Sequence, residues 1–286
     1  MNLVDTAVTY LFVPGDRPER FVKAVAAGVD VVILDLEDAV APERKDFARA
    51  AIAEAWSPLC EQALKAGVEL CLRINCLREE AFTADFALCQ RLTPALVMVP
   101  KVESPDEIAT VTSALPSTRT LALIETATGV LESRAIALAP GLARLVLGSV
   151  DLMLDLGVTD DGTPLDTVRS MLVLASAHAK IGGPVDGVCT SINDVERIRG
   201  DATRARSFGF TGKLCIHPRQ AAPVSHAFEF TDDELSWAAR VVEAAASSAG
   251  SATTVDGAMV DAPVILRAQR ILSRAGLRAR HRKPDA

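Results

Sequence analysis

Four short apolar runs that each end on a charged residue constrain the fold of this chain more than any other feature. They are VVILDLED (31–38), VELCLRIN (68–75), LALIET (121–126) and LVLGSVD (145–151). Continuous apolar runs are typical of strands buried in a parallel sheet, and charged side chains are almost never fully buried without partners. Charges of opposite sign at several strand ends therefore predict one shared polar site at the mouth of a parallel barrel.

Strand-like and helix-like segments alternate along the chain. The strand candidates are 9–13, 30–36, 68–75, 95–101, 119–126, 143–151, 184–190 and 212–217. Such an alternation requires parallel strands joined by right-handed crossovers, and eight of these units close readily into a barrel. Only 4% of the residues are aromatic, so the core must be built from Ala, Val, Leu and Ile. The sequence thus predicts an α/β fold, a (β/α)8 TIM barrel with a C-terminal helical extension.

The segment after the eighth strand candidate is longer than a barrel needs. We expect residues 1–230 to form the barrel core, and residues 231–286 to supply a closing helix at about 231–249 and a C-terminal extension. The extension carries an apolar stripe at helical spacing, formed by Val264, Ile265, Ala268, Ile271 and Leu272. Because the barrel is already complete, we predict that this stripe packs on a neighbouring subunit. Packing back on its own barrel is the alternative.

Charge and cysteine content argue against several classes of function. The net charge is -7 and the one dense basic cluster lies at 278–283, so we expect no nucleic-acid partner. The six cysteines show no CxxC spacing and are expected to be reduced. The sequence contains no long uncharged apolar stretch, and its first residues lack the pattern of a signal peptide. We therefore expect a cytoplasmic protein with no membrane partner.

Two carboxylates end the fifth and sixth strand candidates. Glu125 and Asp151 are thereby placed on neighbouring strands of a barrel, where they can converge on one cation. Two carboxylates with room for water and substrate oxygens suit Mg²⁺, which rarely takes an all-protein cage. The alternative, in which each acid pairs with a basic side chain or caps a helix, is equally compatible with the spacing alone.

Arg73 ends the third strand candidate, so its guanidinium should point to the same mouth. There it can bind a carboxylate or an enolate oxygen, unless it serves only as an ion-pair partner of Glu37 or Asp38. Those two acids close the second strand and are expected to orient Arg73 or to hold metal-bound water. Lys101 ends the fourth strand, where a Schiff-base aldolase would place its lysine, but the surrounding charges favour a pairing role.

The segment PGDRPERF (14–21) joins the first strand to a helix. Asp16 is a candidate N-cap and Glu19 stands three residues later, as in a capping box. Arg17 and Arg20 add positive charge close to this helix start, where a phosphate-bearing ligand would be stabilised. Simple helix initiation explains much of the same pattern.

Eight motifs occur in register over about residues 10–272. They are LFVPGDRPER, ILDLEDAV, LRIN, VPKVES, LIETATG, LGSVDLMLDLG, GFTGKLCIHPRQ and MVDAPV. In this order they resemble the citrate lyase beta-subunit-like family of CoA-ester lyases, within the HpcH/HpaI aldolase superfamily. The resemblance implies a (β/α)8 barrel, usually a homotrimer, that uses Mg²⁺ to make or break carbon–carbon bonds in 3-hydroxyacyl-CoA thioesters.

Position by position, the resemblance makes Glu125 and Asp151 the metal ligands and Arg73 the substrate-binding and catalytic arginine. Asp261 in MVDAPV matches the catalytic acid that members of this family supply from a neighbouring subunit. Phe12 replaces a tyrosine of some relatives, and Glu19 replaces a lysine near the CoA. Arg20, with Arg17 beside it, is therefore the substitute candidate for binding the CoA thioester.

The resemblance implies cleavage of citramalyl-, malyl- or citryl-CoA to an acyl-CoA and a small oxo acid by retro-Claisen chemistry. Three alternatives stay open at this point. The same site can run to hydrolysis or synthesis, as a malyl-CoA thioesterase or a malate-synthase-like enzyme. It can act only with an acyl-carrier partner, as the beta subunit of a citrate lyase complex. It can also be a CoA-free pyruvate aldolase of the related superfamily.

Overall fold

The computed structural model describes residues 3–247 and 253–282. Eight parallel strands pair in chain order, and the last pairs with the first to close a barrel. They are β1 (Thr9–Pro14), β2 (Val31–Asp35), β3 (Glu69–Arg73), β4 (Leu96–Val99), β5 (Arg119–Ile124), β6 (Leu142–Leu147), β7 (Val185–Asp186) and β8 (Gly212–Cys215). Every strand lies inside its predicted segment or within one residue of it, so the predicted (β/α)8 barrel is confirmed.

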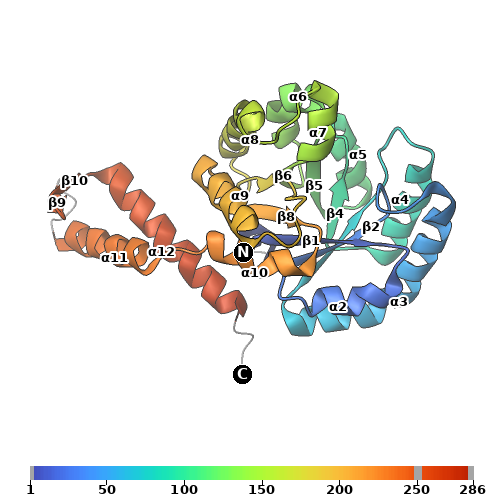
Figure 1. Cartoon of the computed structure of the whole chain (residues 1–286), viewed down its shortest axis with the longest axis horizontal. Helices are drawn as coiled ribbons and strands as arrows, with labels where there is room; N and C mark the ends of the chain where they lie inside the picture. Colours follow the sequence, from blue (N-terminus) through green and yellow to red (C-terminus); the bar gives the residue numbers. More distant parts are fainter. Residues whose placement is uncertain (1–2, 248–252, 283–286) are drawn as a thin grey trace. The chain divides into compact units, whose positions relative to one another are not determined.

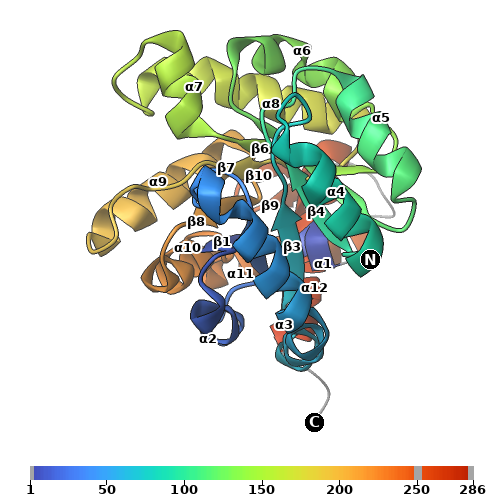
Figure 2. The same ribbon diagram turned by 90° about the vertical axis from the view of Figure 1, so that its right-hand side faces the viewer.

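Helices connect the strands and surround the barrel (Figure 1). They are α1 (Leu3–Thr6), α2 (Phe21–Val25), α3 (Lys45–Ala66), α4 (Ala81–Leu92), α5 (Pro105–Ala114), α6 (Ala127–Ala137), α7 (Ser149–Leu156), α8 (Asp166–Ala179), α9 (Val195–Phe208) and α10 (Ala221–Ala227). Figure 2 shows α3 and α4 outside β3. Ser104 begins α5 with a complete capping box, in which Glu107 is the reciprocal partner.

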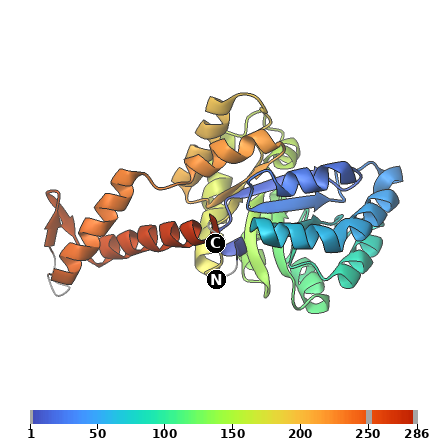
Figure 3. The same ribbon diagram turned by 90° about the horizontal axis from the view of Figure 1, so that it is seen from below.

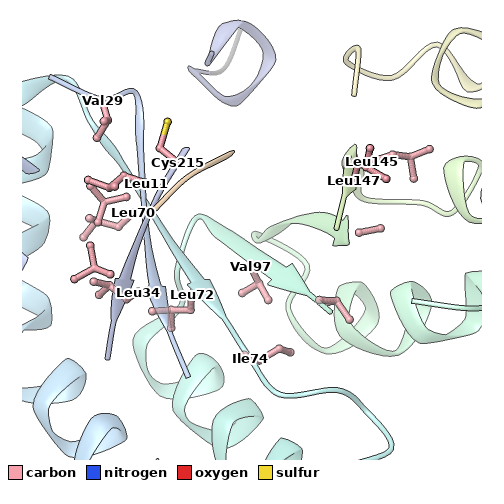
Figure 4. Packing of buried hydrophobic residues seen from close by; sticks show 14 of the residues in the cluster. Leu11, Val29, Leu34, Leu70, Leu72, Ile74, Val97, Leu145, Leu147 and Cys215 are labelled. Carbon is pink, nitrogen blue, oxygen red and sulfur yellow. The ribbon is translucent and has the colours of Figure 1, made fainter. Parts of the chain in front are cut away.

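The strands bury both of their faces. Val32, Leu34 and Leu72 belong to the layer between the strands and the outer helices, part of which is drawn in Figure 4. Val31, Ile33 and Cys71 alternate with them and belong to a second cluster, with Tyr10, Met98 and Leu121. This alternation is the two-residue period of a strand, and it decides which side chains can reach the mouth of the barrel.

The chain divides into two units, Met1–Phe228 and Glu229–Ala286. The second unit contains α11 (Asp232–Ser247), β9 (Thr253–Val255), β10 (Ala258–Val260) and α12 (Ala262–Arg282). Figure 3 shows α11 and α12 as a helical pair with the β9–β10 hairpin at the end where they are joined. The helix that we expected to complete the barrel is α11, and it belongs to this second unit; α10 is the helix that directly follows β8.

The apolar stripe of α12 has a partner inside its own unit. Ala268 and Ile271 are buried in a cluster with Ala238 and Val241 of α11. Val264, Ile265 and Leu272 pack on the edge of the same cluster. The stripe therefore gives no independent reason to expect a neighbouring subunit, and the intermolecular role of this unit stays a prediction.

In the part of the chain that the structure describes, no helix is both long and apolar enough to cross a membrane. All six cysteines are free, and five of them are buried. Burial raises the pKa of the Cys71 thiol well above its ordinary value, as expected for a reduced side chain in an apolar interior.

Candidate active site

The charged strand ends meet at the carboxyl end of the barrel, around a cavity of about 330 Å³. Asp35 and Arg73 come from the ends of β2 and β3, and Glu125 follows β5. Asp151 lies in the first turn of α7, directly after β6. The parallel barrel brings these groups together because all of its strands end at one mouth. Of the residues singled out from the sequence, Arg73, Glu125, Asp151 and Asp38 line this cavity.

Arg73 is held by contacts with Asp35, Glu37 and Phe12. Its Nε and Nη2 atoms donate to the two carboxylate oxygens of Asp35, over 2.7 and 2.6 Å. Its Nη1 atom lies 2.7 Å from Oε2 of Glu37, and its guanidinium carbon lies 4.7 Å from the centre of the Phe12 ring. A bidentate carboxylate and an aromatic face fix the plane of a guanidinium. Arg73 is therefore a permanently charged and rigidly oriented group at the cavity wall.

Asp35 is the partner of Arg73 that the sequence interpretation missed. The two residues are register partners on β2 and β3, and Asp35 is completely buried. Asp35 is two residues after Ile33 and two before Glu37, so the strand period places all three on one side. The expected contact of Glu37 with Arg73 is present over 2.7 Å, whereas Asp38 lies 3.7 Å from the same Nη1 atom.

Glu37 links Arg73 to Lys101. Its Oε1 atom accepts a short hydrogen bond from the Lys101 ammonium. Burial raises the pKa of Glu37 to about 7, although Arg73 and Lys101 both act to lower it. Burial also acts to lower the pKa of Lys101, but its hydrogen bond to Glu37 and the negative charge of that carboxylate outweigh this effect and raise the pKa. Lys101 is thus an ammonium in an ion pair, which agrees with a pairing role rather than a nucleophilic one.

Glu125 is the most strongly perturbed carboxyl group at the mouth. Burial raises its pKa to about 8, and the negative charges of Glu37 and Asp151 add to the effect. Its Oε1 atom accepts a 2.8 Å hydrogen bond from the backbone N–H of Lys101, whose φ of 51° is in the left-handed region. A Cβ atom at Gly148 would come within 2.5 Å of Oε2 of Glu125. Any other residue at position 148 would therefore displace this carboxylate.

The start of α7 forms the next part of the wall. Gly148, Ser149 and Val150 line the cavity together with Asp151. The first N–H groups of a helix have no intrahelical acceptor, and they favour a negatively charged group. The Ser149 residue is only 2% exposed, although it lines the cavity. The site thus offers backbone N–H donors close to two carboxylates.

Glu125 and Asp151 are the residues that can hold a divalent cation. Burial is the main cause of the raised pKa of Glu125 and the negative charges of Glu37 and Asp151 add to it, and a bound cation would stabilise the ionised form of this carboxyl. Among the described residues, no group of three or more His, Cys, Asp or Glu side chains is arranged to enclose a metal ion. Two carboxylates and an open cavity fit Mg²⁺, which keeps several water or substrate ligands.

A second cavity of about 550 Å³ adjoins the first, and both are lined by Phe12, Ala39 and Ile216. Its basic residues are Arg20, Lys23 and His217. Arg17 does not line it; its Nε atom lies 3.8 Å from Asp16 and its side chain is half exposed. The segment 14–21 therefore brings Arg20, and not Arg17, to a cavity.

Asp16 does not cap a helix, contrary to the expectation. The chain forms a 3-10 turn over Pro18–Arg20, with Arg17 at the N-cap position and no side-chain cap. Oδ2 of Asp16 instead accepts a 3.2 Å hydrogen bond from Nε of Arg44. A long-range ion pair has thus replaced the local hydrogen bond that the sequence pattern suggested.

Asp261 lies in the C-terminal unit and not in the barrel. It is exposed, and its Oδ1 atom accepts a 3.2 Å hydrogen bond from the backbone N–H of Val264 at the start of α12. Its role as a catalytic acid for a neighbouring subunit stays a prediction.

Comparisons with known proteins agree with this geometry. The family model described as HpcH/HpaI aldolase/citrate lyase matches residues 9–218. A citrate lyase subunit beta-like protein of Mycobacterium tuberculosis is 36% identical over 96% of this chain and 98% of its own length. A (3S)-malyl-CoA thioesterase of Cereibacter sphaeroides is 30% identical, over 93% of each chain.

A crystal structure of the CitE protein from Mycobacterium tuberculosis, in complex with magnesium, acetoacetate and coenzyme A, has the same fold. The CitE chain is 35% identical to this chain. The alignment covers 95% of this chain and 99% of the CitE chain, with a TM-score of 0.82. The chain therefore belongs to the HpcH/HpaI aldolase/citrate lyase family of carbon–carbon lyases, in its citrate lyase beta-subunit-like branch.

Proposed function

We propose that this enzyme is a Mg²⁺-dependent lyase that cleaves a 3-hydroxyacyl-CoA thioester to an acyl-CoA and a 2-oxo acid. The substrate is of the citramalyl-, malyl- or citryl-CoA type. The observation that carries the proposal is the pairing of Glu125 and Asp151 with the fixed cation Arg73 around one cavity. The relative of known structure that binds magnesium, acetoacetate and coenzyme A supports it.

Glu125 and Asp151 would hold Mg²⁺, which when bound supplies a fixed positive charge to the substrate oxygens. The first residues of α7 line the same cavity, and their backbone N–H groups would bind the substrate carboxylate. Asp35 and Glu37 keep the Arg73 guanidinium in one plane, so no reorganisation is needed during the reaction. These residues therefore orient the substrate before any bond breaks.

In the proposed reaction, the bond between the hydroxyl-bearing carbon and the α-carbon of the thioester breaks. The hydroxyl proton passes to a water molecule as the C=O group of the oxo acid forms, and the electron pair of the broken bond passes to the thioester as an enolate. Arg73 stabilises the negative enolate oxygen. Asp261 of a neighbouring subunit then donates a proton to the enolate carbon, which gives the acyl-CoA.

The second cavity is the proposed channel for the CoA arm. It shares Phe12 and Ile216 with the first cavity, so a thioester at Arg73 can extend into it. Arg20 and Lys23 supply positive charge there for a phosphate group. Arg17 lies outside this cavity and is not part of the proposal.

We expect the Asp261→Asn variant to lose turnover while it keeps Mg²⁺ binding. Asparagine can still accept the hydrogen bond from Val264 N–H, so α12 should begin normally, but it has no proton to donate. Turnover and calorimetric Mg²⁺ binding are measured side by side. Asp256→Asn is the control, since this exposed acid of the same unit pairs with the exposed Arg240. Loss of Mg²⁺ affinity in the Asp261 variant would contradict the assignment.

Mg²⁺ binding should release close to one proton at neutral pH. The pKa of Glu125 is raised to about 8, so in the metal-free protein this group is largely protonated at pH 7. A cation requires the ionised form, and binding therefore competes with the proton. The apparent Mg²⁺ affinity should rise with pH up to about pH 8 and level off above it. Calorimetry in two buffers of different ionisation enthalpy counts the protons; an affinity that is flat below pH 8 contradicts the expectation.

A malyl-CoA thioesterase is the second candidate, because a relative with that name aligns over 93% of this chain. The lyase breaks a carbon–carbon bond and leaves the thioester intact, whereas a thioesterase hydrolyses the thioester and releases free CoA. A thiol-reactive dye added during turnover distinguishes them. Acyl-CoA without free thiol supports the lyase, and stoichiometric thiol supports the thioesterase.

A further inference from the structure

The mouth of the barrel has a charged half and an apolar half. The charged lining residues lie at the ends of β2, β3, β5 and β6: Asp35, Asp38, Arg73, Glu125 and Asp151. The ends of β7, β8 and β1 supply only apolar side chains to the cavity: Val188, Leu214, Ile216 and Phe12. Leu123 and Leu147 extend the apolar surface beneath the charged strand ends. A ligand held at the carboxylates therefore faces an apolar wall.

The charge of the lining is strongly one-sided. Among the described residues that line the cavity, four carboxylates face a single cation, Arg73. When all of them are ionised, the lining carries a net charge of -3, which one divalent cation reduces to -1. The cavity can thus accept one substrate carboxylate at the cation and the start of α7, but it has little positive charge left for another.

Arg73 does not supply that charge to a second carboxylate, because the two N–H groups that Asp35 and Glu37 leave free are those that bind the enolate oxygen in the proposed reaction. Its Nε and Nη2 atoms are engaged by Asp35, and its Nη1 atom is paired with Glu37. One face of the guanidinium is covered by the Phe12 ring. Turning Arg73 towards a second substrate carboxylate would leave Asp35, which is completely buried, without its partner.

We infer that the enzyme selects thioesters with one free carboxylate, in which the remaining substituent on the hydroxyl-bearing carbon is hydrogen or a short alkyl group. This inference rests on the proposed lyase function and names its substrate class. A carboxymethyl substituent would place a second negative charge against the apolar wall of Val188 and Leu214. The oxo acid released is accordingly a monocarboxylate.

Citramalyl-CoA and citryl-CoA test the inference as a matched pair, since they differ only in a methyl or a carboxymethyl group on the same carbon. We expect kcat/KM for citramalyl-CoA to be about 100-fold higher, because like charges placed together cost several kcal/mol. Equal kcat/KM values overturn the inference but leave the lyase proposal standing. Malyl-CoA, whose substituent is hydrogen, is assayed beside them, and turnover of none of the three thioesters overturns the lyase proposal and the inference with it.

Binding of the products gives a readout that does not depend on turnover. With Mg²⁺ present, calorimetry should show that pyruvate binds about tenfold more tightly than oxaloacetate, in spite of the extra carboxylate with which oxaloacetate can contact a cation. Tighter binding of oxaloacetate contradicts the inference.

A cation placed on the apolar wall should weaken the preference. Val188→Lys is the first variant, because Val188 is only partly buried and lines the first cavity but not the second. We expect the ratio of citryl-CoA to citramalyl-CoA kcat/KM to rise about tenfold. Val188→Met adds length without charge and should leave the ratio unchanged. If Val188→Lys does not fold, Ile216→Lys replaces it, because Ile216 is 40% exposed and tolerates a charged side chain more readily. An unchanged ratio of kcat/KM values in a folded lysine variant overturns the inference.

Discussion

Glu125→Gln is expected to lower turnover about a thousandfold and to remove measurable Mg²⁺ binding. A cation at the reacting oxygens supplies several kcal/mol to the transition state, and about 4 kcal/mol corresponds to this factor. The amide keeps the shape of the carboxylate and can still accept the hydrogen bond from Lys101 N–H. The loss would therefore report the missing negative charge and not a collapsed site. Glu132→Gln, on the exposed face of α6, is the control and should behave as wild type.

The same variant should be no less stable than the wild-type protein when Mg²⁺ is absent. The pKa of Glu125 is raised from 4.5 to about 8 by folding, so the folded state binds a proton that the unfolded state has already lost. Stability of the metal-free protein therefore falls as pH rises from about 4.5 to about 8. A glutamine does not titrate and escapes this loss. Thermal unfolding at pH 8 with EDTA measures the difference in stability between this variant and the wild-type protein. A large destabilisation by Glu125→Gln contradicts a metal-binding role.

Arg73→Ala is expected to lower the free energy of unfolding by about 3–5 kcal/mol, in addition to its effect on turnover. The Arg73 side chain is 9% exposed, and its partners Asp35 and Glu37 are 0% and 2% exposed. Removal of the guanidinium leaves both acids buried without their main counter-ion. Urea unfolding followed by circular dichroism gives the difference.

A surface arginine provides the matched control for this measurement. Arg78 also pairs with two acids, Glu103 and Glu107, but its side chain is 48% exposed. Exposed ion pairs contribute about 0–1 kcal/mol, so Arg78→Ala should cost little. An Arg73→Ala variant as stable as Arg78→Ala would show that the buried cluster is not held by this cation.

The sequence was sufficient to predict the barrel because strands of a buried parallel sheet have a recognisable sequence pattern. Each strand, such as Val31–Asp35, is a continuous apolar run, and a helix-like segment follows it. The C-terminal unit was predicted less well. Its apolar stripe on α12 has the right period for a helix, but the period does not say what covers it, and in the structure α11 does so. Periodicity identifies a buried face without identifying its partner.

The position of the candidate site could be predicted from strand ends, but its internal contacts could not. Arg73 and Glu125 were placed at the mouth because each follows an apolar run. Asp35 was missed because it stands inside such a run, and its pairing with Arg73 depends on the register between two strands. The interaction of Asp16 with Arg44 likewise joins residues far apart in sequence. Rules for helix capping consider only residues close in sequence, so they do not predict that a distant arginine takes the Asp16 carboxylate.

The most direct test of the central claim is mass spectrometry of the purified protein incubated with malyl-, citramalyl- and citryl-CoA, in Mg²⁺ and again in EDTA. The account predicts that a thioester disappears only in Mg²⁺, while acetyl-CoA and a 2-oxo acid appear in equal amounts. Loss of thioester that EDTA does not affect, or no loss of any of the three in Mg²⁺, would contradict it.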